Sequence, residues 1–342
     1  MNSDQATSPH AQAPHPGGWR PRLSGWLARS GTLGALSLIA ASLLIWTASW
    51  FWVGEVAASF SWHLGLAGSA GALLLALVRR PRLALLAFLL SASHLWPELS
   101  LWLPNGSADH STVDREELTI ASCNLLWTNL KHEGLHEWLD DVDPDIVAFQ
   151  EVSPDWRIVL EKLSDRYPHL FLSPLEEDWN RGTWGTAVLS RIPLTETRLI
   201  APPENVYKPM IEVVTTLGGK PLTLRTAHPI RPGKSWRIER RNAVLNILAH
   251  EDWSGQSMLL GDLNVTSTSP AFSSLLQNSG LHDSRAGFGR QPSYTTPVPL
   301  CNLSVAIDHV LVSDAIHVLE RRTEALAGSD HLSVVVKVTA VE

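Results

Sequence analysis

The residues of this chain that are best suited to catalysis are an acid and an amide two positions apart. The apolar run Met258–Leu260 leads into Gly261, and Asp262 and Asn264 follow. Because side chains alternate faces along a strand, Asp262 and Asn264 point the same way at the end of a predicted strand. Such a pair suits a site that activates water beside a phosphate. An Asx-rich turn that caps a helix predicted to start at Ser269 explains the same two residues equally well.

Polar residues stand at the ends of several other apolar segments that are predicted to be strands. Strands are predicted at residues 118–126, 144–151, 184–190, 222–227, 258–263, 305–312 and 332–338, and helices at 132–141, from 153 onward and at 236–250. The polar residues at the strand ends are Asn124, Glu151, His228, Asp262, Asn264, Asp308, Asp330 and His331. The pattern by itself predicts an α/β or α+β architecture.

Seven short segments together resemble the endonuclease/exonuclease/phosphatase superfamily of metal-dependent phosphoesterases. They are Ser-Cys-Asn124, Phe-Gln-Glu151, Thr186–Arg191, Thr-Ala-His228, Gly-Asp262-Leu-Asn264, Ile-Asp308-His-Val-Leu-Val and Ser-Asp330-His331, and they occur in the family's order. One such segment is a weak signal, whereas seven in order are a strong one. The resemblance implies a four-layer α/β/β/α sandwich over residues 115–342, in which two mixed sheets lie face to face with helices outside.

The resemblance also implies a divalent-cation site. Glu151 would be the principal ligand of Mg²⁺ or Mn²⁺, and Asn124 and Asp330 would complete or tune the ligand shell. Such a donor set is chemically reasonable, because Mg²⁺ keeps most of its water ligands and takes only one or two carboxylates.

The remaining members of the set would act on water and phosphate. Asp262 would orient and deprotonate the attacking water, and Asn264 would hold Asp262 and a phosphate oxygen. His228 and His331 would donate hydrogen bonds to the non-bridging oxygens as negative charge develops there. Asp308 would keep His331 protonated, because a nearby carboxylate raises the pKa of a histidine. The implied reaction is in-line hydrolysis of a phosphoester by water.

Structural roles compete with these assignments when each residue is taken alone. Asn124 could cap a loop, and His228 could pack in the core. A stability role does not explain the whole set, because stability does not require polar residues at so many strand ends. Trp184, Arg240 and Arg241 are candidates for substrate binding, although a core tryptophan and an ordinary helix face explain them equally well.

Three apolar stretches precede this domain. Gly31–Val53 and Val56–Val78 contain no charged residue, and each is long enough to cross a bilayer. Core helices of a soluble domain are the alternative for these two. The third stretch, Leu83–Leu103, contains Pro97 and Glu98 and therefore either spans the membrane or lies on its surface. We predict an anchor of three transmembrane helices over residues 31–103.

The arginines predict how this anchor is oriented. Arginines at positions 20–29 and 79–82 flank the first two stretches on one side, and the positive-inside rule places that side in the cytoplasm. Residues 1–30 are then a disordered cytoplasmic segment. A third span would carry the chain through a linker at 104–114 to the outer side of the cytoplasmic membrane. If the third stretch does not span, the large domain is cytosolic.

Charge and layout bear on the substrate. Residues 110–342 carry 21 basic and 30 acidic residues, a formal charge of −9. A non-specific nuclease normally has a basic surface for the phosphate backbone. We therefore favour hydrolysis of a lipid-linked phosphate, pyrophosphate or phosphodiester over a membrane-tethered nuclease of DNA or RNA. A catalytically inactive membrane scaffold is the third hypothesis, which the intact set of polar residues disfavours.

The layout, with the segments Gly-Asp262-Leu-Asn-Val-Thr and Ile-Asp308-His, is also similar to bacterial membrane-anchored members of the superfamily that are associated with glycopeptide resistance. Other properties stay open at this level. The only cysteines, Cys123 and Cys301, either form a disulfide or are two small buried residues. The sequence names neither the substrate, the preferred metal, a protein partner nor the oligomeric state.

Overall fold

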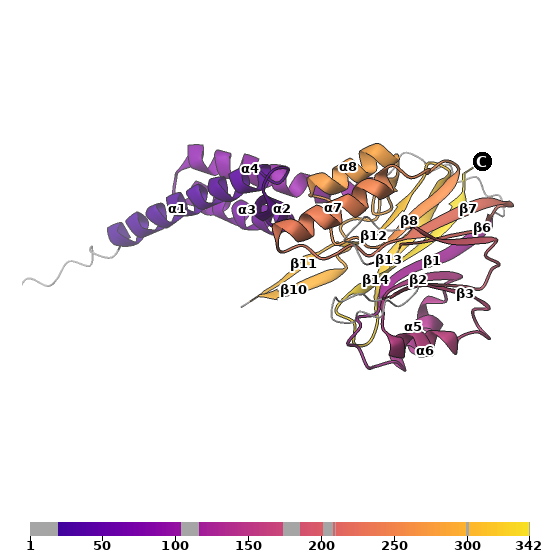
Figure 1. Cartoon of the computed structure of the whole chain (residues 1–342). Coiled ribbons are helices and arrows are strands. Elements are labelled where there is room, and N and C mark those ends of the chain that lie inside the picture. Colours follow the sequence, from indigo (N-terminus) through magenta and orange to yellow (C-terminus); the bar gives the residue numbers. More distant parts are fainter. Residues whose placement is uncertain are drawn as a thin grey trace, which may run out of the picture.

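A computed structural model describes residues 20–103, 116–173, 185–200, 208, 210–298 and 301–341 of the chain. Two six-stranded sheets lie face to face, and a group of helices extends from one end of this sandwich (Figure 1). Residues 1–19 of the predicted disordered segment and the predicted linker, residues 104–114, lie outside the described residues.

The first sheet is built around two parallel strands, β1 and β2, and its other neighbouring strands are antiparallel. Its strand order is β13 (Ile316–Ala325), β14 (Leu332–Ala340), β1 (Glu117–Asn124), β2 (Ile146–Val152), β4 (Gly185–Ser190) and β3 (His169–Leu172). Helices α5 (Gly134–Val142) and α6 (Pro154–Glu161) cover its outer face. Ser153 starts α6, because its hydroxyl accepts a hydrogen bond from the backbone N–H of Trp156.

The second sheet also contains one parallel pair, β7 and β8. Its strand order is β5 (Glu196–Ile200), β6 (Met210–Leu217), β7 (Lys220–Thr226), β8 (Gln256–Asp262), β12 (Asp308–Val312) and β9 (His282–Asp283). Helices α7 (Ser235–Ala249) and α8 (Pro270–Ser279) pack on its outer face. A separate hairpin, β10 (Tyr294–Val298) and β11 (Cys301–Val305), projects from the sandwich (Figure 1). The single strand predicted at 305–312 is therefore two strands.

Alternation along the strands divides the core into layers. Met258 and Leu260 of β8 lie in the core between the two sheets, whereas Leu259 lies in the core beneath α7 and α8. In β1, Ile120 faces the other sheet and Ala121 faces α5 and α6. Each sheet thus buries both faces, which explains why these strands are almost wholly apolar. The predicted four-layer sandwich is confirmed.

The N-terminal helices are α1 (Arg20–Trp46), α2 (Trp52–Ala58), α3 (Ser61–Leu77) and α4 (Pro81–Leu99), followed by the short 3₁₀ helix η1 (Ser100–Trp102). Small residues line the contacts between α1, α3 and α4, including Ala35, Ala72, Ala84 and Ala87. Large apolar side chains cover the outside, as expected of helices that face lipid.

By length and composition, two segments of the described chain can cross a membrane, Arg29–Trp46 and Pro81–Trp102. Helices α2 and α3 count as a third span only if they are taken together, and they are bent by 69° with respect to each other. The predicted second span is therefore not one continuous helix. At the break, the carbonyl of Ala58 accepts hydrogen bonds from the hydroxyls of Ser61 and Thr268, at 2.8 and 2.6 Å. These bonds satisfy the freed backbone group.

The first helix also corrects a prediction. It begins at Arg20, inside the segment that was predicted to be disordered up to residue 30. Pro21 is compatible with this start, because proline is tolerated in the first turn of a helix. No other proline follows before the helix ends at Trp46.

Two buried carboxylates of the helical bundle are paired with arginines of the sandwich. Glu55 in α2 lies 2.5 Å from Arg241 in α7 and accepts a hydrogen bond from Ser269. Glu98 in α4 lies 3.6 Å from Arg285, and the Arg285 side chain is fully buried. A buried charge without a partner is costly, so these pairs hold the bundle and the sandwich together.

We predict that Glu55→Ala lowers the free energy of unfolding of the detergent-solubilised protein by about 3–5 kcal/mol, because it leaves Arg241 buried and unpaired. The apolar double variant Glu55→Leu/Arg241→Met should recover most of this loss. Denaturant or thermal unfolding measures both. Glu320→Gln is the control, since it removes only solvent-exposed ion pairs with Lys337 and Arg322 and should change stability by less than about 1 kcal/mol. Equal stability of Glu55→Ala and the unaltered chain would contradict the pairing.

Candidate active site

The sheet topology brings the polar strand ends together at one end of the sandwich. Parallel β1 and β2 end side by side and place Asn124 near Glu151. Parallel β7 and β8 do the same for His228, just after β7, and for Asp262. Asp308 begins β12 directly opposite Asp262 in the antiparallel pair of β8 and β12. The two parallel pairs, one in each sheet, therefore explain why residues far apart in sequence meet.

The backbone around this group is unusual in three places. Gly261 has φ +141°, and a Cβ atom there would lie 2.1 Å from the carbonyl oxygen of Ala227, so only glycine allows this close approach of β7 and β8. Glu151 and Asn264 have φ of +57° and +52°, in the left-handed region that side chains rarely adopt. Strained residues of this kind cluster at functional sites, and these two flank the catalytic group.

Asp262 lies at the centre of the group and is buried. Its Oδ2 atom lies 3.2 Å from the donating amide of Asn124 and 3.4 Å from Nε2 of His228, and its Oδ1 accepts the backbone N–H of Asn264. Burial would raise the pKa of Asp262, but the cationic His331 and the hydrogen bond and charge of His228 hold it well below its usual range. The carboxylate is therefore ionised at neutral pH and accepts hydrogen bonds from its surroundings.

His331 is held between two carboxylates. Its Nδ1 lies 2.8 Å from Oδ2 of Asp308, and its Nε2 lies 3.8 Å from Oδ2 of Asp262. Burial lowers the pKa of His331, but the charges of Asp308 and Asp262 outweigh it and raise the pKa to about 10. Burial also raises the pKa of Asp308. The His331–Asp308 pair thus keeps its proton at neutral pH, as the sequence resemblance implied, and His331 can donate a hydrogen bond.

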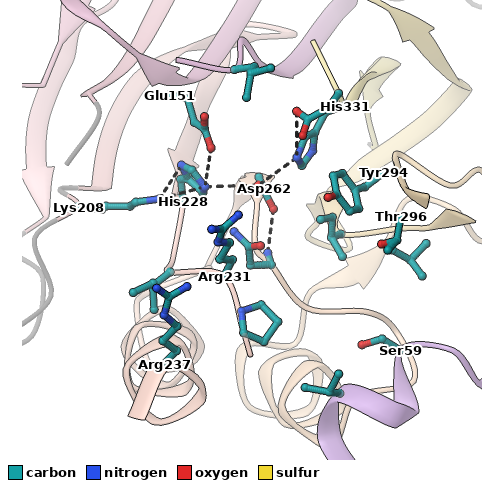
Figure 2. Close-up of a pocket in the computed structure, with 18 of the residues that line it drawn as sticks. Ser59, Glu151, Lys208, His228, Arg231, Arg237, Asp262, Tyr294, Thr296 and His331 are labelled. Atoms are coloured by element: carbon teal, nitrogen blue, oxygen red, sulfur yellow. Dashed lines mark hydrogen bonds and ion pairs between the residues drawn. The ribbon is translucent and has the colours of Figure 1, made fainter. Parts of the chain in front are cut away.

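Lys208 is a site residue that sequence reasoning missed. Its Nζ lies 3.1 Å from both ring nitrogens of His228 (Figure 2). Burial lowers the pKa of Lys208 to about 8, although Glu151 and Asp262 act in the opposite direction. No apolar pattern precedes Lys208 in the sequence, and no segment of the family resemblance includes it, so nothing in the sequence marked it.

The donor atoms present fit a hard divalent cation. Glu151 has one oxygen bound by the backbone N–H of Trp127 at 3.1 Å, while its other oxygen lies 3.8 Å from Nε2 of His228. Asp262, Asp308 and His331 also place possible ligand atoms within 4.8 Å of one another, but the proton that His331 keeps excludes this histidine as a ligand. Carboxylates and amide oxygens are the ligands that Mg²⁺ and Mn²⁺ prefer, so the chemistry of the site agrees with the predicted cation.

A pocket of about 750 Å³ opens in front of these residues. Its lining includes six of the predicted site residues, Glu151, His228, Asp262, Asn264, Asp330 and His331. Asn124 and Asp308 lie behind them and are buried. The pocket also borders three residues at the break between α2 and α3, which are Val56, Ser59 and Phe60. The helical bundle and the sandwich therefore share one pocket, which has the size of a small-molecule site.

The structure separates the three candidates for substrate binding. Arg240 lines the pocket. Arg241 does not, because its side chain is only 2% exposed and is bonded to Glu55 and to the backbone carbonyl of Asn264, so its assignment as a substrate ligand is corrected. Trp184 lies outside the described residues. Cys123 is a free, buried cysteine.

Comparisons with known proteins agree with this geometry. A family model described as the Endonuclease/Exonuclease/phosphatase family matches residues 121–331. A search of curated proteins finds no match. Among solved structures, an endonuclease/exonuclease/phosphatase from Beutenbergia cavernae is similar with a TM-score of 0.54 and 20% identity, covering 66% of this chain and 72% of that one.

Two further solved structures show the same fold. Danio rerio TDP2 complexed with a single-strand DNA product has a TM-score of 0.52 and 18% identity, covering 65% of this chain and 99% of that one. An endonuclease/exonuclease/phosphatase from Bacteroides vulgatus has a TM-score of 0.51 and 15% identity, covering 66% and 99%. Sequence identities this low support only a shared fold.

The four-layer fold and its polar strand ends define a metal-dependent phosphoesterase. The chain belongs to the Endonuclease/Exonuclease/phosphatase family, whose model covers more than half of it. It is a hydrolase that acts on phosphoester bonds and uses a divalent metal.

We predict that Glu151→Gln weakens Mg²⁺ or Mn²⁺ binding by at least about 100-fold, because loss of an outer-shell partner alone commonly costs 10–100-fold. Hydrolysis should fall with it, and a chelator should abolish hydrolysis until metal is restored. Metal titration followed by calorimetry measures binding, and far-UV circular dichroism checks the fold. Glu161→Gln, an exposed glutamate on neighbouring α6, is the matched control. Full activity in excess chelator would exclude the metal mechanism.

Proposed function

We propose that this chain is a membrane-anchored, Mg²⁺- or Mn²⁺-dependent phosphoesterase that hydrolyses a lipid-linked phosphate, pyrophosphate or phosphodiester at the membrane surface. One observation carries the proposal: the apolar helices supply part of the wall of the catalytic pocket. Val56 and Phe60 border the same space as Asp262 and His331. A phosphate in this pocket therefore lies next to the helices that would enter the bilayer.

The composition of the pocket suits an amphiphilic substrate. Its charged part is formed by the catalytic residues, and its apolar part includes Phe60, Trp236 and Val305. Its volume is sufficient for a phosphorylated headgroup, while a long lipid tail would have to stay outside it. The simplest arrangement keeps that tail in the bilayer beside α3 and α4 while the phosphate reaches Asp262.

Within the pocket, each residue has a role that its contacts support. Ionised Asp262 orients the attacking water, and Asn264 fixes Asp262 through its backbone N–H. His228 and protonated His331 stand within 4 Å of Asp262 and would donate to the non-bridging phosphate oxygens. Glu151, with Asn124 and Asp330, would hold the cation. A bound divalent cation stabilises the negative charge that develops on the phosphate and on the leaving oxygen.

The proposed orientation places the sandwich outside the cytoplasm. The bundle contacts the sandwich through α2 and the end of α4, where Glu55 and Glu98 lie. Arg79, Arg80 and Arg82 lie in and beside the turn between α3 and α4, at the end of α4 opposite to Glu98. α4 has 19 residues and is therefore about 28 Å long, close to the hydrocarbon thickness of a bilayer. The positive-inside rule then assigns the arginine end to the cytoplasm.

Substrate class is tested by assaying the full-length protein in mixed micelles against a polyprenyl diphosphate, a polyprenyl monophosphate, phospholipids, and single- and double-stranded DNA. We expect hydrolysis of a lipid phosphate and little cleavage of DNA. Phe60→Ala should raise KM for the lipid several-fold and leave hydrolysis of soluble bis(p-nitrophenyl) phosphate unchanged. Leu66→Ala, at an exposed leucine of α3, is the matched control. Preferential cleavage of DNA would replace this proposal with a tethered nuclease.

Orientation is tested separately with reporters joined after Glu342. Alkaline phosphatase, which folds only outside the cytoplasm, should be active there, and a fluorescent protein that requires the cytoplasm should stay dark. The same fusions at Arg80 should give the opposite pattern, because that turn is assigned to the cytoplasm. A fluorescent fusion at Glu342 would place the catalytic domain in the cytosol and redirect the search to soluble phosphates.

A further inference from the structure

Three arginines line the catalytic pocket, of which only Arg240 was named above as a candidate for substrate binding. Arg231 lies in the loop between β7 and α7, and Arg237 and Arg240 lie in the first two turns of α7. Figure 2 shows Arg231 and Arg237 along the part of the pocket between His228 and Ser59. Trp236 lines the same region, with the guanidinium groups of Arg237 and Arg240 at 5.2 and 4.8 Å from its ring centre.

Among the described residues, none of these three arginines forms an ion pair with a carboxylate. Most other arginines of the sandwich do, such as Arg225 with Glu212 and Arg285 with Asp283. In addition, Nε of Arg237 is buried and has no hydrogen-bond partner there. An unsatisfied buried donor is costly, so a partner that the described chain does not supply is expected at this position.

The start of α7 points to the charge of that partner. Lys234 is the N-cap residue and provides no side-chain cap, and the first turn contains no acidic residue. The positive end of the helix dipole therefore lies beside Lys234 and Arg237, an arrangement that is unfavourable by itself. A bound anion would relieve it, because its negative charge offsets the helix dipole and it accepts hydrogen bonds from the guanidinium groups.

This anion is distinct from the phosphate that is hydrolysed. The reacting phosphate already has His228, His331 and Lys208 beside Asp262 as cationic or hydrogen-bonding partners. Arg237 and Arg240 belong to α7, and Figure 2 shows Arg231 beside Asp262 and Arg237 further along the pocket. We propose that Arg231, Arg237 and Arg240 form a second anion subsite that holds a second phosphoryl group of the substrate.

This inference rests on the proposed function and narrows it to a lipid diphosphate. In such a substrate, the oxygen of water bonds to the phosphorus beside Asp262, and the bond between that same phosphorus and the bridging oxygen breaks. The bridging oxygen keeps the bonding electron pair and leaves with the group held by the arginines. The proton lost by water passes to the released products or to solvent, so the reaction consumes one water and needs no further reactant.

Calorimetric titration of the full-length protein in detergent tests the subsite, with inorganic pyrophosphate and inorganic phosphate as probes and no divalent cation added. We expect pyrophosphate to bind at least tenfold more tightly than phosphate. Arg237→Gln and Arg240→Gln should each weaken pyrophosphate binding about tenfold and change phosphate binding less than twofold, because a hydrogen bond to a charged group is worth about 1.5–3 kcal/mol. Arg237→Lys should retain part of the affinity.

Arg157→Gln is the matched control, because Arg157 is an exposed residue of α6 that pairs with Glu161. Circular dichroism of each variant confirms its fold. The subsite would be overturned if pyrophosphate and phosphate bound with equal affinity, or if the arginine variants lost affinity for both probes equally. Absence of binding of both probes would also overturn it. Two phosphate ions bound with similar affinity would also overturn the diphosphate assignment and indicate a separate anion, such as a neighbouring lipid headgroup. Lipid hydrolysis does not enter the measurement, so the subsite and the proposed function can fail independently.

Discussion

One guanidinium group connects the apolar helices to the catalytic loop. Arg241 pairs with Glu55 of α2 through one nitrogen, and another nitrogen donates to the backbone carbonyl of Asn264 at 3.1 Å. Both charges are buried, so neither can move away without losing its partner at a cost of several kcal/mol. The left-handed backbone of Asn264, which holds Asp262 in place, is fixed in the same contact. The geometry of the catalytic loop therefore depends on a residue of the helical bundle.

In the catalytic group, too, each buried charge has a partner of opposite charge. Asp262 and Asp308 are two buried carboxylates at directly opposed positions, an arrangement that repulsion would disfavour. His331 lies between them and carries a proton to alkaline pH, and His228 and Lys208 add hydrogen bonds and positive charge on the other side of Asp262. If a phosphate binds beside Asp262 as proposed, these donors already stand next to it, and little reorganisation would be required.

The strand pattern of the sequence predicted an α/β or α+β domain, and the family resemblance added the sandwich and most of the site. Apolar runs that end in Asn124, Glu151 or Asp262 mark strand ends. The order of these segments along the chain matches the order in the family, which groups them into one site. The sequence did not predict Lys208, because this residue lies in no predicted strand or helix and therefore has no periodic signal. Arg241 was misassigned for a related reason: the sequence shows a basic helix face but not the carboxylate, 186 residues away, that pairs with it.

The two acidic residues that interrupted the apolar stretches have partners in the structure that the sequence does not reveal. Glu98 made the third stretch a weak candidate span, and Glu55 separated the first two. In the structure, both are paired with arginines of the sandwich, so they belong to the docking surface of the bundle and not to its exposed apolar side. The break between α2 and α3 lies at the same surface, where Thr268 binds the freed carbonyl of Ala58. The docking contacts therefore place Ser59 and Phe60 against the pocket, and the contacts that join the bundle to the sandwich also shape the entrance to Asp262.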